Sequence, residues 1–167
     1  MNSPFGFLVI DKPKGITSHD CVNRVRKIFG VRRVGHGGTL DPAVTGVLPL
    51  AIGSATRLLS YLPGDKKYKG IIQLGTSTST DDLDGEIISL KRWPEISKNS
   101  LDKVFDQFRG IIKQQPPNVS SVHFKGERAY QKARRGENFS LTKKEITIFN
   151  LQITNWDQEE GKLSITV

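Results

Sequence analysis

The sequence predicts an α+β fold with a mixed, largely antiparallel central sheet and flanking helices. Short apolar runs typical of strands are interspersed with amphipathic segments typical of helices, and they do not follow the regular strand–helix–strand order of a parallel sheet. The chain has 167 residues, of which 36% are hydrophobic, with 16 glycines and 8 prolines. This length and composition suit one globular domain with a substantial core.

The first elements are a strand and a helix. Residues 7–10 form an unbroken apolar run, which predicts a short buried strand. Ser18 is the expected N-cap of a helix that runs to Phe29, and Gly30 ends this helix. One face of the helix is apolar and is expected to be buried; it comprises Cys21, Val22, Val25, Ile28 and Phe29.

Five further strands are expected along the chain. They cover residues 46–52, 68–74, 85–90, 146–156 and 163–167, with a polar loop over 76–84. The last strand continues to Val167 without a cap or tail. We therefore expect the chain to be a fragment that ends inside its sheet, which makes the predicted fold a truncated one.

Three more helices complete the expected elements. Short helices are predicted over residues 55–62 and 127–135. The third helix ends at Gly110 and is amphipathic, because its apolar residues follow the spacing i, i+3, i+4, i+7; they are Leu101, Val104, Phe105 and Phe108.

The net charge indicates the class of partner. Lys plus Arg number 25 and Asp plus Glu 17, which gives a net charge of +8, and the pI is about 9.7. A charge of this sign favours a polyanionic partner, most simply a nucleic acid, although a solubilising surface charge is the alternative. The single cysteine excludes an intrachain disulfide and suits a reducing compartment. The apolar run near the N-terminus is too short for a signal peptide or a membrane span, so we expect a cytoplasmic protein without a membrane anchor.

Residues 35–47, with the sequence GHGGTLDPAVTGV, are the most informative segment. Glycines allow a backbone to approach a ligand closely, and the neighbouring Arg32 and Arg33 suggest that this ligand is anionic. Asp41 is the only acid in the segment and is a candidate catalyst. The alternative is that Asp41 only starts a turn.

Several kinds of site are excluded by their missing motifs. Leu40 interrupts the glycine pattern of a dinucleotide-binding loop, and there is no phosphate-binding Gly-Lys-Ser/Thr. The three histidines are dispersed, with too little cysteine for a recognisable zinc site. A motif for a nucleophilic serine or cysteine is also missing. We therefore expect neither a cofactor nor a metal.

Several motifs together resemble the TruB family of tRNA pseudouridine synthases. They are KPxGxTS at residues 12–18, GHGGTLDPxxTGVLP at 35–49, ATR at 55–57, KY at 67–68, GxxTxTxDxxG at 75–85, QPPxxS at 115–120 and GxxAYxxAR at 126–134. The motifs occur in the family's order over nearly the whole chain. The resemblance implies a pseudouridine synthase catalytic domain over residues 1–167, with residues 111–140 as an RNA-clamping insertion.

This resemblance implies an isomerase that acts on tRNA. The enzyme would convert one uridine, position 55 of the TΨC loop in the T-arm, to pseudouridine, after flipping the base out of its stack. Asp41 would act on the ribose, either as a nucleophile at C1′ or as a base at C2′. The reaction balances in atoms and electrons, so the family needs no cofactor, and we expect a monomer without a metal.

The resemblance also assigns roles around Asp41. Tyr68 would stack on the target base, Arg57 would lie beside the site, and Asp82 would help to hold a catalytic arginine. Lys12 and Pro13 would shape the floor of the site. Each assignment has a structural alternative: an aromatic of the core for Tyr68, a surface cation for Arg57 and a turn residue for Asp82.

A larger set of residues is expected to contact RNA. His36 would read the folded T-loop, and the basic residues of the clamp would meet phosphates, with affinity falling as salt rises. A merely solvated helix face is the alternative for the clamp. The expected contacts are His36, Gly37, Thr39, Arg32, Arg33, Lys125, Arg128, Lys132, Arg134 and Arg135.

Two other functions stay open at this point. Catalytic subunits of guide-RNA pseudouridylation complexes share the Gly-Thr-Leu-Asp-Pro block. The chain also stops before the Ser-Gly-Thr-Tyr-Ile-Arg-like block of the family, whose arginine pairs with the catalytic aspartate, and it lacks the C-terminal RNA-binding domain. An inactive RNA-binding fragment is therefore the other alternative.

Overall fold

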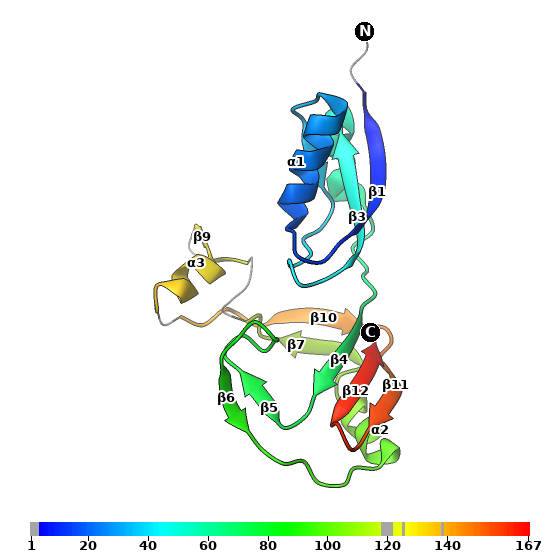
Figure 1. Ribbon diagram of the computed structural model, residues 1–167, viewed down its shortest axis with the longest axis vertical. Coiled ribbons are helices and arrows are strands. Elements are labelled where there is room, and N and C mark those ends of the chain that lie inside the picture. The colour runs from blue at the N-terminus through cyan, green and yellow to red at the C-terminus, as the bar shows by residue number, and fades with distance from the viewer. Residues whose placement is uncertain (1–3, 118–121, 125, 138) are drawn as a thin grey trace. The chain divides into compact units, whose positions relative to one another are not determined.

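The computed structural model describes residues 4–117, 122–124, 126–137 and 139–167. These residues form two compact units, one ending at Asp65 and the other comprising Lys66–Val167 (Figure 1). Every strand pairing among the described residues is antiparallel, and helices accompany the strands in both units. The α+β prediction is thereby confirmed.

The first unit is a small sheet covered by one helix. The sheet has the order β1–β3–β2, with β1 at Gly6–Lys12, β2 at Val34–His36 and β3 at Gly46–Ile52. The helix α1 covers Ser18–Phe29, and a 3-10 helix, η1, covers Gly53–Tyr61. The predicted strand over 46–52 and the predicted end of α1 are confirmed, whereas β2 was not predicted and the segment over 55–62 is 3-10 rather than α-helical.

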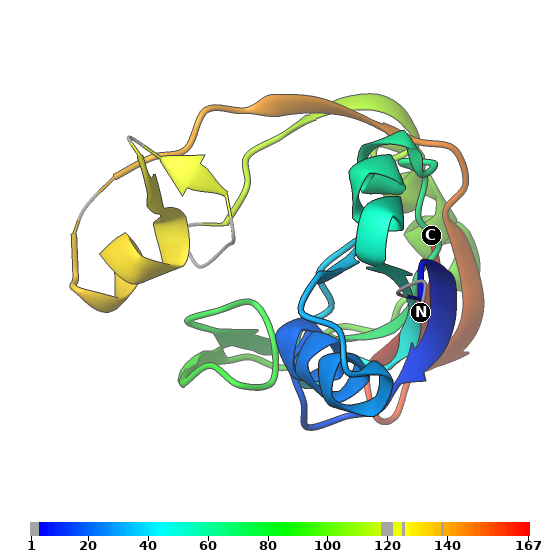
Figure 2. The ribbon, with the colours of Figure 1, turned by 90° about the horizontal axis from the view of Figure 1, so that it is seen from above.

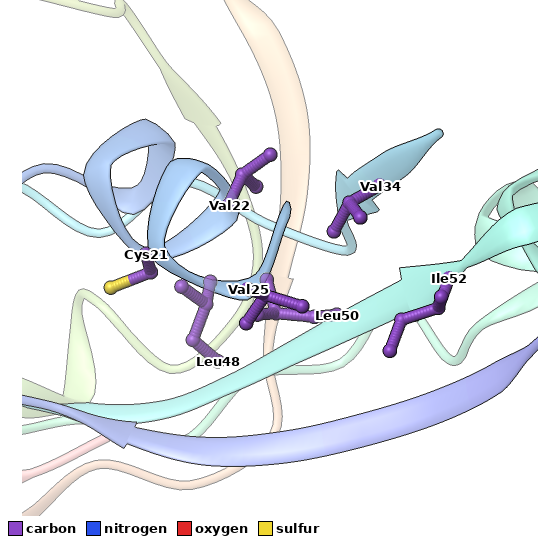
Figure 3. Packing of buried hydrophobic residues seen from close by; sticks show 7 residues of the cluster. All are labelled: Cys21, Val22, Val25, Val34, Leu48, Leu50 and Ile52. Carbon is purple, nitrogen blue, oxygen red and sulfur yellow. The ribbon is translucent and has the colours of Figure 1, made fainter. Parts of the chain in front are cut away.

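The core of this unit lies between α1 and the sheet (Figure 3). Cys21, Val22 and Val25 of α1 face the buried residues Leu48, Leu50 and Ile52 of β3, with Val34 of β2 beside them. The burial of these apolar side chains is the main contribution that holds the helix on the sheet.

The N-cap prediction for α1 was wrong by one residue. Thr17 is the N-cap, and it forms a capping box with Asp20: Thr17 Oγ1 accepts a hydrogen bond from the Asp20 N–H (3.0 Å), and Asp20 Oδ2 accepts one from the Thr17 N–H (2.8 Å). Ser18 is instead the first residue inside the helix. Gly30 ends the helix with a φ of 63°, as its freedom from a Cβ allows.

The buried face of the first unit is narrower than the sequence predicted. Ile28 is 76% exposed and Phe29 43% exposed, because the sheet covers only the earlier turns of α1. The strand over 7–10 is half-buried rather than buried: Leu8 and Ile10 pack against the core, whereas Phe7 and Val9 lie on the exposed face of the alternating strand.

The described residues of the second unit form four small sheets. Their orders are β11–β12–β4, β10–β7, β5–β6 and β8–β9. The strands are β4 (Lys69–Gln73), β5 (Thr76–Thr78), β6 (Ile87–Leu90), β7 (Gly110–Gln114), β8 (His123–Phe124), β9 (Glu127–Arg128), β10 (Lys144–Ile148), β11 (Gln152–Asp157) and β12 (Lys162–Thr166).

Two helices belong to this unit, α2 at Lys98–Asp106 and α3 at Ala129–Arg134. The core around α2 consists of Leu101 and Phe105 packed with Leu151 and Leu163, while Phe108 lies beyond the end of the helix and is exposed. Figure 2 shows α3 at the end of the pair β7 and β10, beside the short strands that precede it.

Several strand predictions in this unit were incomplete. The single strand expected over 146–156 is two strands, because β10 pairs with β7 and β11 pairs with β12. The polar loop expected over 76–84 begins with β5, and the helix expected over 127–135 begins with the strand β9. Among the described residues, no helix is both long and apolar enough to cross a membrane.

Candidate functional site

Asp41 lies on an exposed loop, residues 37–45, that connects β2 to β3. Its carbonyl oxygen accepts a hydrogen bond from the Val44 N–H at 3.0 Å, so Asp41 does start a turn. Its side chain is exposed, and within the described part of the chain no hydrogen bond or ion pair to its carboxylate is found. The carboxylate is therefore open to a ligand.

The residue before Asp41 is fixed by Ser18. Ser18 Oγ accepts a hydrogen bond from the Leu40 N–H (2.9 Å) and donates one to the Leu40 carbonyl oxygen (3.2 Å). Ser18 is buried, with 3% of its surface exposed, so water does not compete for these bonds.

The residue after Asp41 is fixed by the turn that follows β1. The Pro42 carbonyl oxygen accepts a hydrogen bond from the Gly15 N–H at 2.7 Å, and Lys12 Nζ lies 3.5 Å from the same oxygen. Lys12 is completely buried, and its ammonium group also donates to the carbonyl oxygens of Pro13 (3.0 Å) and Ile16 (2.8 Å). The buried Lys12 side chain thus joins the turn after β1 to the loop that carries Asp41, while Pro13 is an exposed residue of that turn.

The glycines of this segment have a packing role that the sequence did not predict. A Cβ at Gly35 would lie 2.9 Å from Leu59 Cδ1, and a Cβ at Gly37 would lie 2.6 Å from Leu62 Cδ1. Both glycines therefore allow η1 and the residue after it to pack closely on β2. His36 lies between them, and its Nδ1 is buried without a hydrogen-bond partner among the described residues.

Three arginines of the first unit, Arg32, Arg33 and Arg57, lie on its surface. Arg33 Nε donates a hydrogen bond to Thr56 Oγ1 at 2.7 Å, which ties the segment before β2 to η1. Arg32 and Thr39 are exposed, and Arg57 is exposed on η1. These exposed groups are accessible to a polyanion.

Tyr68 lies in the second unit, directly before β4. Its backbone exchanges two hydrogen bonds with Val167, from the Tyr68 N–H (2.7 Å) and from the Val167 N–H (3.0 Å). The residue is 44% exposed, which does not fit the alternative of a core aromatic. The ring is accessible for stacking.

Asp82 stabilises its own turn. Its Oδ1 accepts hydrogen bonds from Thr80 Oγ1 (2.5 Å) and from the Asp84 N–H (2.9 Å), and these bonds lower the pKa of the carboxyl. No ion pair to Asp82 is found in the described ranges, and its hydrogen bonds are those of a turn residue. Asp82 also lines a pocket of about 300 Å³ together with Ile71, Ile72, Gln73, Thr76, Ser77, Thr78, Asp81 and Leu83.

The clamp region contains a closed ion-pair network of two bases and two acids. Arg135 binds Glu127 through both terminal nitrogens (2.5 and 2.8 Å) and donates from Nε to Glu137 (2.8 Å). Lys132 lies 3.5 Å from Glu127 and 3.0 Å from Glu137. Mainly through its hydrogen bonds, Arg135 lowers the pKa of Glu127 to about 2. It is also the main cause that lowers the pKa of Glu137.

The other clamp residues are placed less fully. Arg128 belongs to β9 and Arg134 is the last residue of α3, whereas Lys125 lies outside the described residues. Within the described part of the chain, no group of three or more His, Cys, Asp or Glu side chains is arranged to hold a metal ion.

The chain matches one protein family over most of its length. A family model described as "TruB family pseudouridylate synthase (N terminal domain)" matches residues 26–167. The chain belongs to this family. The resemblance that the motifs indicated is thereby confirmed.

Two curated relatives of this TruB family chain carry the same name. A protein of Prochlorococcus marinus (strain NATL1A) named "tRNA pseudouridine synthase B" is 62% identical over 167 residues, which are 100% of this chain and 53% of that protein. A protein of the same name from Synechococcus sp. (strain CC9311) is 59% identical, with 56% of its length covered. The chain spans about half the length of the curated relatives it matches.

Solved structures support the fold. A chain in "Crystal Structure of a Cbf5-Nop10-Gar1 Complex" matches with a TM-score of 0.70 and 27% sequence identity, over 98% of this chain and 39% of that chain. A chain in "Structure of H/ACA RNP bound to a substrate RNA containing 2'-deoxyuridine" matches with a TM-score of 0.64 and 24% identity, over 98% of this chain and 37% of that one.

The sequence did not reveal the roles of two groups of residues, one at the Asp41 loop and one in the clamp region. Ser18 was interpreted as a helix cap, although its hydroxyl binds the Leu40 backbone. Glu127 and Glu137 were not considered, although they neutralise two clamp cations. A signal for the second group was present, because the two acids flank the basic helix in the sequence.

Proposed function

We propose that this chain is the catalytic part of a tRNA pseudouridine synthase that isomerises uridine 55 in the TΨC loop. The observation that carries the proposal is Asp41: its carboxylate is exposed on a loop whose neighbouring residues, Leu40 and Pro42, are both held by hydrogen bonds. A reactive group needs a fixed position at the reacting atoms, and this arrangement supplies one. The family and the name shared by its curated relatives support the reaction class.

The reaction would proceed at the ribose of a flipped-out uridine. The N1–C1′ bond breaks, the uracil rotates, and a C5–C1′ bond forms, while the C5 proton leaves to solvent and N1 gains a proton. Asp41 serves either as the nucleophile at C1′ or as the base at C2′. Because atoms and electrons balance, the chemistry requires neither ATP nor a redox cofactor.

The exposed ring of Tyr68 suits the flipped base. Stacking of an aromatic side chain on a base contributes roughly 1–3 kcal/mol, and Tyr68 is accessible at the start of β4. Arg57 would place a positive charge beside the part of the RNA on which Asp41 acts. Asp82 would orient an arginine through a carboxylate whose Oδ1 already accepts hydrogen bonds from Thr80 and the Asp84 N–H.

The remaining contacts would hold the T-arm. His36, Gly37, Thr39, Arg32 and Arg33 would meet the loop, and residues 111–140 would clamp it through Arg128, Lys132, Arg134 and Arg135. Lys132 and Arg135 must exchange carboxylates for phosphates when they do so. The enzyme would act as a monomer in the cytoplasm on tRNA, the substrate in the name of its relatives.

A transcribed T-arm stem-loop tests the proposal. The RNA carries tritium at C5 of uridine, so that each isomerisation releases one tritium to water. We expect release from the RNA with the protein alone, and none when the target uridine is replaced by cytidine. A protein that binds this RNA yet releases no tritium would contradict the proposal.

A second candidate function is catalysis within a guide-RNA complex, because one of the matched solved structures is a Cbf5-Nop10-Gar1 complex. The same assay distinguishes the two functions. Release from the bare T-arm without guide RNA or further proteins supports the tRNA enzyme, whereas release that depends on a guide RNA supports the second function.

A further inference from the structure

The hydroxyl of Ser18 is not needed by its own helix. The cap of α1 is supplied by the capping box of Thr17 and Asp20, in which both side chains bind the backbone of the other residue. Serine at the start of a helix usually binds a backbone N–H of the same helix. Here Ser18 Oγ instead binds Leu40, 22 positions further along the chain.

The geometry of this contact restrains one peptide unit on each side of Leu40. A single oxygen accepts from the Leu40 N–H at 2.9 Å and donates to the Leu40 carbonyl at 3.2 Å. That carbonyl belongs to the peptide bond that joins Leu40 to Asp41. Because Ser18 is 3% exposed, water cannot replace the hydroxyl as a partner without opening the packing of α1.

We propose that Ser18 is a positioning residue for Asp41. It fixes the orientation of the peptide plane from which Asp41 projects, while Lys12 and Gly15 fix the carbonyl of Pro42 on the other side. This inference rests on the proposed function, in which Asp41 acts on the ribose. Ser18 itself touches neither the RNA nor the reacting atoms.

Two neighbouring substitutions separate positioning from helix stability. Ser18→Ala removes the hydroxyl that binds Leu40, whereas Thr17→Ala removes the hydroxyl that caps α1 and leaves Leu40 untouched. For Ser18→Ala we expect kcat on T-arm RNA to fall by about 10- to 100-fold with KM unchanged, since small misplacements of a reactive group cost up to about that much. For Thr17→Ala we expect a lower Tm with kcat retained. Equal losses of kcat in the two variants would overturn the proposal.

Exchange of the Leu40 amide hydrogen provides a second readout that does not depend on activity. Ser18→Ala should make the Leu40 amide exchange faster, and Thr17→Ala should leave it as in the unchanged protein. If the unchanged protein releases no tritium from T-arm RNA, the proposed function fails, and the Leu40 exchange alone decides whether Ser18 holds the loop. Unchanged Leu40 exchange in Ser18→Ala would overturn the inference in either case.

Ser18→Cys is the variant to use if Ser18→Ala does not fold. It keeps a side chain of similar shape with a weaker donor and acceptor. We expect a kcat between those of the serine and alanine proteins and a Leu40 exchange that is moderately faster. A Ser18→Cys protein equal to the unchanged protein in both measurements would overturn the inference.

Discussion

The ammonium group of Lys12 lies 3.5 Å from the carbonyl oxygen of Pro42, the residue that follows Asp41. Lys12 is completely buried, and a buried charge is costly unless hydrogen bonds replace its water. Three backbone carbonyl oxygens, those of Pro13, Ile16 and Pro42, surround this ammonium group. The turn after β1 and the loop of Asp41 are therefore joined through one side chain.

Lys12→Met should destabilise the protein without changing the size of the side chain much. The carbonyl oxygens of Pro13 and Ile16 lose a charged donor, and hydrogen bonds to charged groups contribute about 1.5–3 kcal/mol each in net terms. We expect the free energy of unfolding in urea to fall by at least the contribution of one such bond, about 1.5–3 kcal/mol. Lys14→Met, at an exposed position of the same turn, is the control and should change it by less than about 0.5 kcal/mol. Equal effects of the two substitutions would contradict the role of Lys12.

Gly37→Ala should destabilise the first unit by overpacking. The added Cβ would lie 2.6 Å from Leu62 Cδ1 and 3.0 Å from Pro49 Cγ, so the Leu62 side chain must shift and the contact with Pro49 becomes tight. Overpacking of this kind costs about 1–3 kcal/mol. Gly38→Ala has no atom within 4 Å of the new Cβ and serves as the control. Thermal unfolding of the two variants, with a clearly lower Tm for Gly37→Ala alone, is the measurement.

The ion-pair network of the clamp should make the stability of this region depend on pH under acidic conditions. The Arg135 guanidinium lowers the pKa of Glu127 to about 2, below the ordinary value of about 4.3. A carboxyl with a lowered pKa in the folded state contributes stability above its unfolded pKa and loses it as the pH falls through the folded value. We therefore expect the Glu127 contribution to be complete above about pH 4.5 and to disappear as the pH falls towards about 2.

A carboxyl-detected NMR titration of Glu127 checks this expectation. The matched control is Arg135→Gln, in which the midpoint should return towards the ordinary range of about 4. A midpoint that is the same with and without Arg135 would contradict the network.

Arg32 and Arg135 should differ in their contribution to RNA binding. Each contact with a phosphate contributes about 0.7–0.9 to the slope of log K against log salt. Arg32 is exposed, and no ion pair to it is found among the described residues, whereas Arg135 is bound by two carboxylates. Arg32→Gln should therefore reduce the salt slope more than Arg135→Gln does in a fluorescence titration with T-arm RNA.

The sequence predicted correctly those elements that are determined by the residues within and next to them. The strand over 46–52 and the end of α1 at Phe29 match the structure, because alternation, periodicity and Gly30 act locally. Ile28 and Phe29 continue the apolar face of α1 but lie beyond the part that the sheet covers, and only tertiary packing decides this. The strand expected over 146–156 is divided by its two different partners, which no local pattern reveals.

The candidate site was predictable to a similar degree. The motif around Asp41 indicated the loop, and the Lys12 ammonium group lies 3.5 Å from the carbonyl oxygen of Pro42 within it. The contact of Ser18 with Leu40 was not predictable, because Leu40 is distant in the sequence. Thr17, the actual cap, and Ser18 are equally suitable caps by residue type. The acids that hold Lys132 and Arg135 changed the prediction for the clamp from simple phosphate contacts to contacts that compete with Glu127 and Glu137.

The most direct test of the account is Asp41→Asn, assayed with the tritiated T-arm RNA. Asparagine has nearly the same shape but lacks the charge needed to attack C1′ or to take the C2′ proton, and loss of such a group typically lowers kcat by on the order of 10⁴-fold or more. Because the Asp41 side chain is exposed, the Tm and the affinity for RNA should stay close to those of the unchanged protein. We expect RNA binding without measurable tritium release, and release at the rate of the unchanged protein would contradict the account.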